Sequence, residues 1–69
     1  MRLKGTVKWF SLENGFGFIE TELKEVGDVF VEYSSIQMDG FKVLEKGQKV
    51  EFDLEKDDRG NIAKRVIII

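Results

Sequence analysis

The chain contains no cysteine, no histidine and no proline among its 69 residues. Without cysteine it has no disulfide and no thiol chemistry, and without histidine it lacks the commonest metal ligand and general base. A metal could be held only by carboxylates, so we expect neither a metal site nor a cofactor. The absence of proline also removes slow X-Pro isomerisation as a folding step.

The chain also lacks a basic excess. Eleven Lys and Arg are outnumbered by 13 Asp and Glu, which gives a formal net charge of −2 and an isoelectric point near 5.1. Binding driven mainly by phosphate neutralisation needs many more cations than anions. A nucleic-acid partner would therefore have to be held largely by other contacts.

No charged leader precedes an apolar stretch, and no apolar run is long enough to cross a membrane. We expect a cytoplasmic protein without a membrane partner, folded as a single domain over residues 1–69. A chain this short buries roughly 60% of the surface that it exposes when unfolded. It can spare few aromatic side chains for the solvent unless they have a role.

What the chain does contain is a series of short alternating stretches separated by turn-forming residues. The expected strands are Leu3–Phe10, Phe16–Thr21, Val29–Tyr33, Lys49–Glu55 and Ile62–Ile69. Residues 34–36 suit a single helical turn, residues 37–47 a long loop and residues 56–61 a turn. No window supports a helix of three turns. The pattern predicts an all-β fold, a small five-stranded antiparallel barrel.

The parity of two strands separates aromatic from aliphatic side chains. In Gly15–Ile19 the two phenylalanines point to one face and Ile19 to the other; in Val29–Glu32 the valines point to one face, and Phe30 and Glu32 to the other. The aliphatic side chains suit a barrel core. A cluster of aromatic rings is then left on the solvent face, where such clusters usually mark a binding surface.

Aromatic rings on a sheet can stack with unpaired bases, at about 1–3 kcal/mol for each base. The expected stacking residues are Trp9, Phe16, Phe18, Phe30 and Phe41, with Phe10 and Tyr33 at the margin. Lys8 and Arg59 are the expected phosphate contacts. Since Trp9 and Phe10 are neighbours, they can share a face only if the first strand is bulged or bent. Phe52 is in phase with Val50 and Leu54 and is expected in the core.

Three segments, Gly5–Phe10, Gly15–Ile19 and Val29–Val31, resemble the opening strand and the two ribonucleoprotein motifs of the cold-shock domain family. Further segments follow in the family's order and at similar spacing, namely Ser34–Ile36, Gly40–Phe41 and Leu44–Phe52. The resemblance covers nearly the whole chain. It implies a five-stranded OB-type barrel that binds single-stranded RNA or DNA, and Lys8 matches the family's basic residue in the opening strand.

The chain departs from the family pattern at three positions. The family usually has a basic residue where Asn14 stands, a histidine where Glu32 stands and a proline where Asn61 follows Gly60. Asn14 and Glu32 make the expected surface less favourable for phosphate. We therefore expect binding that is weaker, or more selective, than in a typical member.

The leading hypothesis is a non-catalytic binder of single-stranded nucleic acid that acts as an RNA chaperone. A second hypothesis is a protein-interaction module that self-associates through the aromatic surface and the apolar segment Val66–Ile69, with reduced or lost nucleic-acid binding. A third is a cold-shock sequence that keeps the fold and has lost binding. An enzyme is not expected, because the chain offers no nucleophile-base pair and no metal set.

Overall fold

The computed structural model describes residues 1–69 and contains five strands and one 3₁₀ turn. These are β1 (Arg2–Ser11), β2 (Phe16–Thr21), β3 (Asp28–Glu32), η1 (Tyr33–Ser35), β4 (Lys49–Asp57) and β5 (Gly60–Ile68). The five predicted strands are confirmed, as is the absence of a long helix. The turn expected over residues 56–61 is shorter, because pairing between β4 and β5 continues to Asp57 and Gly60. No helix in the structure could span a membrane.

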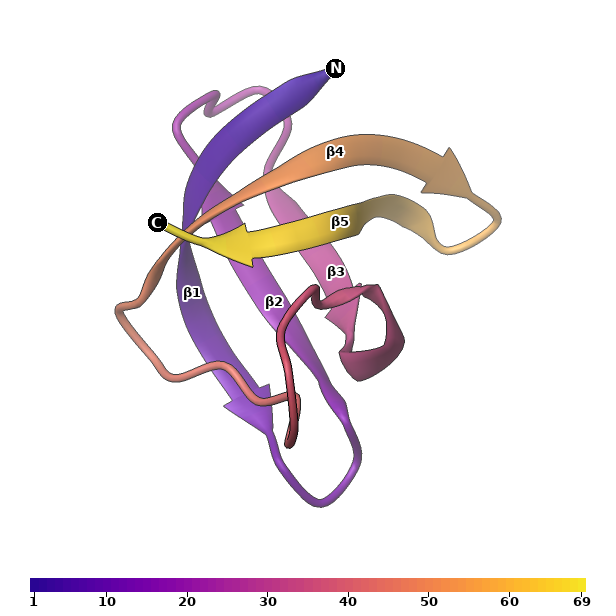
Figure 1. Cartoon of the computed structure of the whole chain (residues 1–69). Helices are drawn as coiled ribbons and strands as arrows, with labels where there is room; N and C mark the ends of the chain where they lie inside the picture. The colour runs from indigo at the N-terminus through magenta and orange to yellow at the C-terminus, as the bar shows by residue number, and fades with distance from the viewer.

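The strands close into a barrel in the order β1-β2-β3-β5-β4. Figure 1 shows β1, β2 and β3 side by side as one curved sheet, with the β4–β5 hairpin crossing it. Neighbouring strands are antiparallel except β3 and β5, which meet in parallel through the single pair Phe30 and Ile62. The predicted all-β OB-type barrel is confirmed, and the parallel pair is the closing contact that an entirely antiparallel barrel would not have.

The barrel interior is filled by aliphatic side chains and one ring. Ile19, Val29 and Val31 are fully buried, and so are Val50 and Phe52 of β4. The period of two in these strands therefore assigned the inward faces correctly. Because the interior is already filled, the other aromatic rings are left for the outside.

The long segment between η1 and β4 is irregular, as expected, but it is tied to the barrel. Ile36 and Leu44 belong to the buried core. The backbone N–H of Gly47 donates a hydrogen bond to the carbonyl of Val7 (2.8 Å). The loop is therefore anchored to the barrel at both ends, while residues 39–42 in its middle are exposed to solvent.

The end of β5 contains a backbone irregularity that the sequence pattern did not predict. Arg65 has a φ of 51°, and the register between β4 and β5 shifts opposite it. This bulge turns Val66 into the core, where it is fully buried. Beyond it Ile68 and Ile69 remain exposed (39% and 56%). The apolar segment Val66–Ile69 thus begins in the core and ends in solvent.

Candidate nucleic-acid interface

A cluster of four aromatic rings lies on the outer face of β1, β2 and β3. We call it the aromatic platform, and its members are Trp9, Phe16, Phe18 and Phe30. Each ring contacts two others at centroid distances of 5.4–5.7 Å, in tilted or edge-to-face arrangements. The three phenylalanines are half-buried and Trp9 is 43% exposed. The rings support one another and still offer free surface to a ligand.

Strand register places three of the four platform residues in one row, with Phe16 two residues away along β2. Trp9 pairs with Phe18 across β1 and β2, and Phe18 pairs with Phe30 across β2 and β3. A shift of register between Val7 and Trp9 in β1 interrupts the alternation. The shift lets Val7 stay in the core and Trp9 face outwards, although regular alternation would put both on the same side.

The close approach of β1 and β2 at this bulge requires Gly17. A Cβ atom on Gly17 would lie 2.2 Å from the carbonyl oxygen of Trp9 and 2.7 Å from Cα of Phe10. Only glycine fits there, so Gly17 lets Trp9 sit against the rings on either side of it in β2.

Phe10 does not join the aromatic platform. It is half-buried and packs against the core cluster. The sequence allows Trp9 and Phe10 to share a face only if β1 is bulged. The bulge is present, but Trp9 faces outwards and Phe10 packs against the core, so the two side chains lie on different faces. Part of Phe10 still lines a surface hollow that also contains Trp9 and Phe41.

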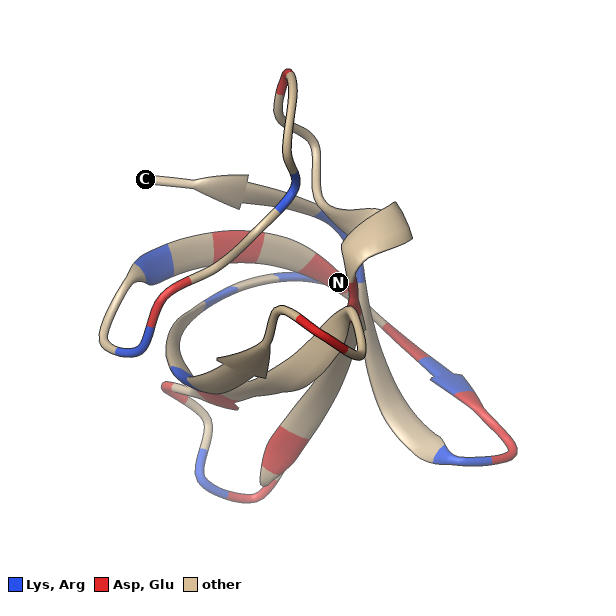
Figure 2. Ribbon diagram, turned by 90° about the horizontal axis from the view of Figure 1, so that it is seen from below, with Lys and Arg blue, Asp and Glu red and all other residues tan.

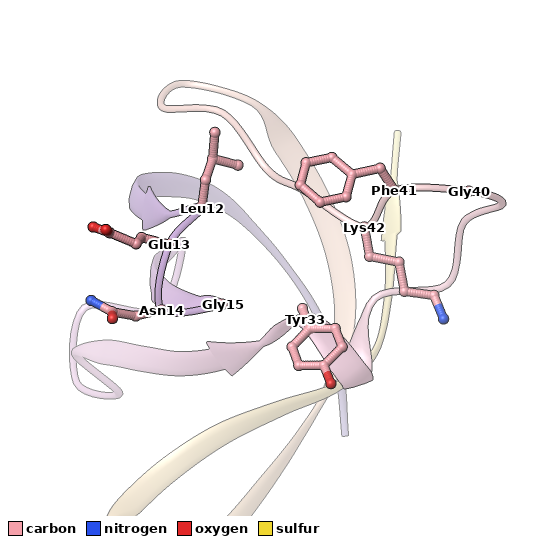
Figure 3. A pocket seen from close by; sticks show the side chains of 8 residues that line it. All are labelled: Leu12, Glu13, Asn14, Gly15, Tyr33, Gly40, Phe41 and Lys42. Atoms are coloured by element: carbon pink, nitrogen blue, oxygen red, sulfur yellow. The ribbon is translucent and has the colours of Figure 1, made fainter.

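Phe41 and Tyr33 flank the platform without contacting its rings in aromatic pairs. They are 75% and 57% exposed and line a hollow of about 420 Å³ beside the β1–β2 turn. Figure 3 shows Leu12–Gly15 on one side of this hollow and Gly40–Lys42 on the other, with Tyr33 between them. Phe41 therefore belongs to the rim of this hollow as a loop residue rather than as part of the sheet.

Two residues that the sequence did not indicate as binding residues also line the hollows next to Phe41. Leu12 is 59% exposed and lines the hollows on both sides of Phe41. Lys46 lines the hollow that contains Trp9 and Phe41. Neither carries a sequence signal, since both lie in irregular segments whose path depends on tertiary packing. Only the positions of the rings reveal them.

Arg59 extends from the β4–β5 turn onto the platform. Its guanidinium carbon lies 4.8 Å from the centroid of the Phe30 ring, a cation–π distance. Nη2 is 2.7 Å from Oδ2 of Asp57 and 3.7 Å from Oε1 of Glu32. The hydrogen bonds from Arg59 hold the pKa of Asp57 below its ordinary value, and those to Asp57 raise the pKa of Arg59.

The cations expected to contact phosphate are already paired in the free protein. Lys8 Nζ lies 3.2 Å from Oδ2 of Asp28, and Arg59 faces Asp57 and Glu32. Figure 2 shows basic and acidic segments interspersed along the strands and loops, without a broad region of one sign. Both pairs are exposed to solvent, where such ion pairs are weak.

The comparisons with known proteins agree with this geometry. The model of the 'Cold-shock' DNA-binding domain matches residues 3–69. The chain belongs to the cold-shock domain family. It is 54% identical over 69 residues to a cold shock-like protein of Aquifex aeolicus, covering 100% of this chain and 97% of that protein. It is 59% identical over 63 residues to the cold shock protein CspC of Bacillus subtilis, covering 91% and 92%.

Among solved structures, this cold-shock chain resembles the Drosophila Unr CSD456 structure with a TM-score of 0.79 at 20% identity. The match covers 100% of this chain and 27% of that one. The structure of Ag(I)CusF matches with a TM-score of 0.65 at 16% identity, covering 100% of this chain and 96% of the other. At these identities the two likenesses concern the barrel fold alone.

Proposed function

We propose that the chain is a non-catalytic binder of single-stranded RNA or DNA and that bases stack on the aromatic platform. One observation carries the proposal: four mutually contacting rings occupy the outer face of β1–β3 although the core is filled without them. Membership of a family described as DNA-binding supports the same conclusion. Each stacked base contributes about 1–3 kcal/mol, so binding does not need a basic protein.

Single strands are preferred in this proposal because a duplex hides the faces of its bases by stacking and pairing. A protein that traps unpaired segments disfavours hairpins, and we propose that the chain acts on RNA in this way, as a chaperone. Lys8 and Arg59 would exchange their carboxylate partners for phosphates, while Phe41 and Tyr33 would cover bases at the edge of the platform. In this proposal Phe10 is left out of the stacking surface, because Phe10 packs against the core.

The fluorescence of Trp9 tests the proposal. An unstructured pyrimidine-rich oligonucleotide should quench the emission with a saturable curve, because a stacked base contacts the indole. A duplex of the same sequence should have little effect at the same concentration. A few stacked bases, after the cost of ordering the strand, give a dissociation constant of micromolar or below. Unchanged emission with tens of micromolar single strand would therefore contradict stacking on Trp9.

A second candidate function is self-association. Its supporting observation is that Ile68 and Ile69 stay exposed at the end of β5, close in sequence to buried Val66. Replacing both isoleucines with serine should abolish any concentration-dependent sedimentation if this segment is an interface. A wild-type chain that sediments as a monomer, and whose oligonucleotide affinity survives the double substitution, would rule this candidate out.

A further inference from the structure

The carboxylate of Glu32 lies beside the aromatic platform. Glu32 pairs with Phe16 across β2 and β3 and follows Phe30 at the spacing that puts both side chains on the same face of β3. Its side chain is 43% exposed. A carboxylate is thus located at the edge of the surface on which bases are proposed to stack.

The oxygens of Glu32 are free to accept hydrogen bonds. The nearest cation is Arg59, whose Nη2 lies 3.7 Å from Oε1 of Glu32, which is longer than a hydrogen bond. Arg59 is held instead by Asp57, to which it donates from its backbone N–H and from two guanidinium nitrogens at 2.7–3.1 Å. Glu32 can therefore engage a ligand without breaking a hydrogen bond that positions Arg59.

We infer that Glu32 makes this part of the platform select guanine over the other bases. The inference rests on the proposed function, since it concerns a base stacked on Phe16 or Phe30. An ionised carboxylate only accepts hydrogen bonds, and it offers two oxygens side by side. Guanine is the base whose Watson–Crick edge presents two adjacent donors, N1–H and the N2 amino group, in matching geometry. Such charge-assisted pairs are stronger than neutral ones.

The other bases each place a lone pair against one of the two oxygens. Thymine and uracil have a single N3–H between two carbonyl oxygens, while cytosine and adenine have an amino group beside an unprotonated ring nitrogen. Only guanine therefore satisfies both oxygens of Glu32 at once.

The test is a competition assay with short DNA strands. Unlabelled heptamers of thymidine, each with a single guanine at one of the seven positions, compete against fluorescein-labelled dT7, and anisotropy reports displacement. One position should show an affinity gain of about five- to tenfold for guanine. Adenine or cytosine at that position should give less. Hypoxanthine, which keeps N1–H but lacks the N2 amino group, should fall between guanine and thymine.

Two variants assign the effect. Glu32→Gln should reduce the guanine preference to less than about twofold, because an amide offers only one acceptor and replaces the other with a donor. It should leave dT7 affinity unchanged or higher, since a negative charge is removed. Glu51→Gln removes the same charge from the outer side of β4, where Glu51 faces Arg2 at 3.9 Å, and should keep the preference.

Each outcome decides between the claims. Equal affinity of the wild-type chain for all strands would overturn the guanine inference and leave the proposed function standing. A guanine preference that persists in Glu32→Gln would overturn the role of Glu32. No binding of any strand, including dT7, would overturn the proposed binding of single-stranded DNA and the inference with it.

Discussion

At the scale of the residue, phenylalanines of one chain serve two opposite purposes. Phe52 is fully buried, whereas Phe41 is 75% exposed, and the platform rings lie between these extremes. Burial alone does not identify a binding residue, since half-buried rings are common at the edge of a core. Their mutual contacts on one outer face, beside a core that is complete without them, identify the platform.

Phe52→Ala should cost about 3–5 kcal/mol of unfolding free energy, because it opens a cavity where no solvent reaches. This loss is at least as large as the whole unfolding free energy expected of so short a chain. Phe41→Ala is the matched control and should change the unfolding free energy by less than about 0.5 kcal/mol. Urea unfolding followed by circular dichroism measures both. Similar losses in the two variants would contradict the assignment of core and surface.

The two residues that depart from the family's basic pattern have measurable consequences. Asn14→Lys combined with Glu32→His should raise affinity for a pyrimidine-rich strand about three- to tenfold, since each exposed electrostatic change is worth up to about 1 kcal/mol. Filter binding at neutral pH and moderate salt measures the change. If the double variant shows no gain, these positions do not limit binding.

At the scale of the element, regular alternation predicted most strands and faces, and irregularities account for what it missed. Ile19 and Val29 were predicted inside because their strands alternate without interruption, and both are fully buried. Phe10 and Val66 follow bulges, which change the face of every residue beyond them. The adjacent Trp9 and Phe10 indicate the bulge in β1, whereas nothing in the local pattern indicates the one at Arg65, because it depends on contacts with β4.

The same limit applies to the candidate site. The four platform rings could be selected from parity and family resemblance, because they lie in or beside regular strands. The approach of Arg59 to Phe30 could not, since it depends on the closing contact between β3 and β5 and on the length of the β4–β5 turn. Lys46 was missed for a similar reason. Contacts that span distant segments need the closed barrel.

Gly17→Ala should test the close approach of β1 and β2. Its Cβ would lie 2.2 Å from a backbone oxygen, so the strands must separate. We expect a loss of at least about 2 kcal/mol, at the upper end of what overpacking costs. Gly40→Ala is the control: its φ is 76° but nothing lies within 4 Å, so the cost should be about 1 kcal/mol. Equal losses in thermal unfolding would contradict the role of Gly17.

At the scale of the whole molecule, charge contributes little to binding in this account. The formal net charge is −2, and the two cations expected to contact phosphate, Lys8 and Arg59, already face carboxylates. With two or three phosphate contacts on a single strand, the logarithm of the binding constant should fall by about 1.5 to 2 for each tenfold increase in salt. Titrations at salt concentrations from about 50 to about 500 mM, a tenfold range, measure how steeply the binding constant falls with salt. A slope above about 4 would show that electrostatics dominates.

Acid should weaken the fold through two carboxylates. Hydrogen bonds from Arg65 hold the pKa of Asp53 below its ordinary value, and those from Arg59 do the same for Asp57. Since both pKa values are lower in the folded state, their stabilisation is present above the unfolded pKa and is lost as the pH falls below about 4. Thermal midpoints between pH 6 and 3 should fall less steeply in Asp53→Asn. An identical decline would contradict this contribution.

Affinity and stability measured together on Phe18→Ala and Phe30→Ala test the stacking of bases on the platform most directly. Both variants should bind a pyrimidine-rich single strand at least about tenfold more weakly, because a stacked base is worth about 1–3 kcal/mol. Their unfolding free energies should change by about 1 kcal/mol, because half of each ring is already exposed to water. Ile68→Ala, a truncation of an exposed side chain on β5, should change neither quantity appreciably. Undiminished binding in both ring variants, or global unfolding of both, would contradict the account.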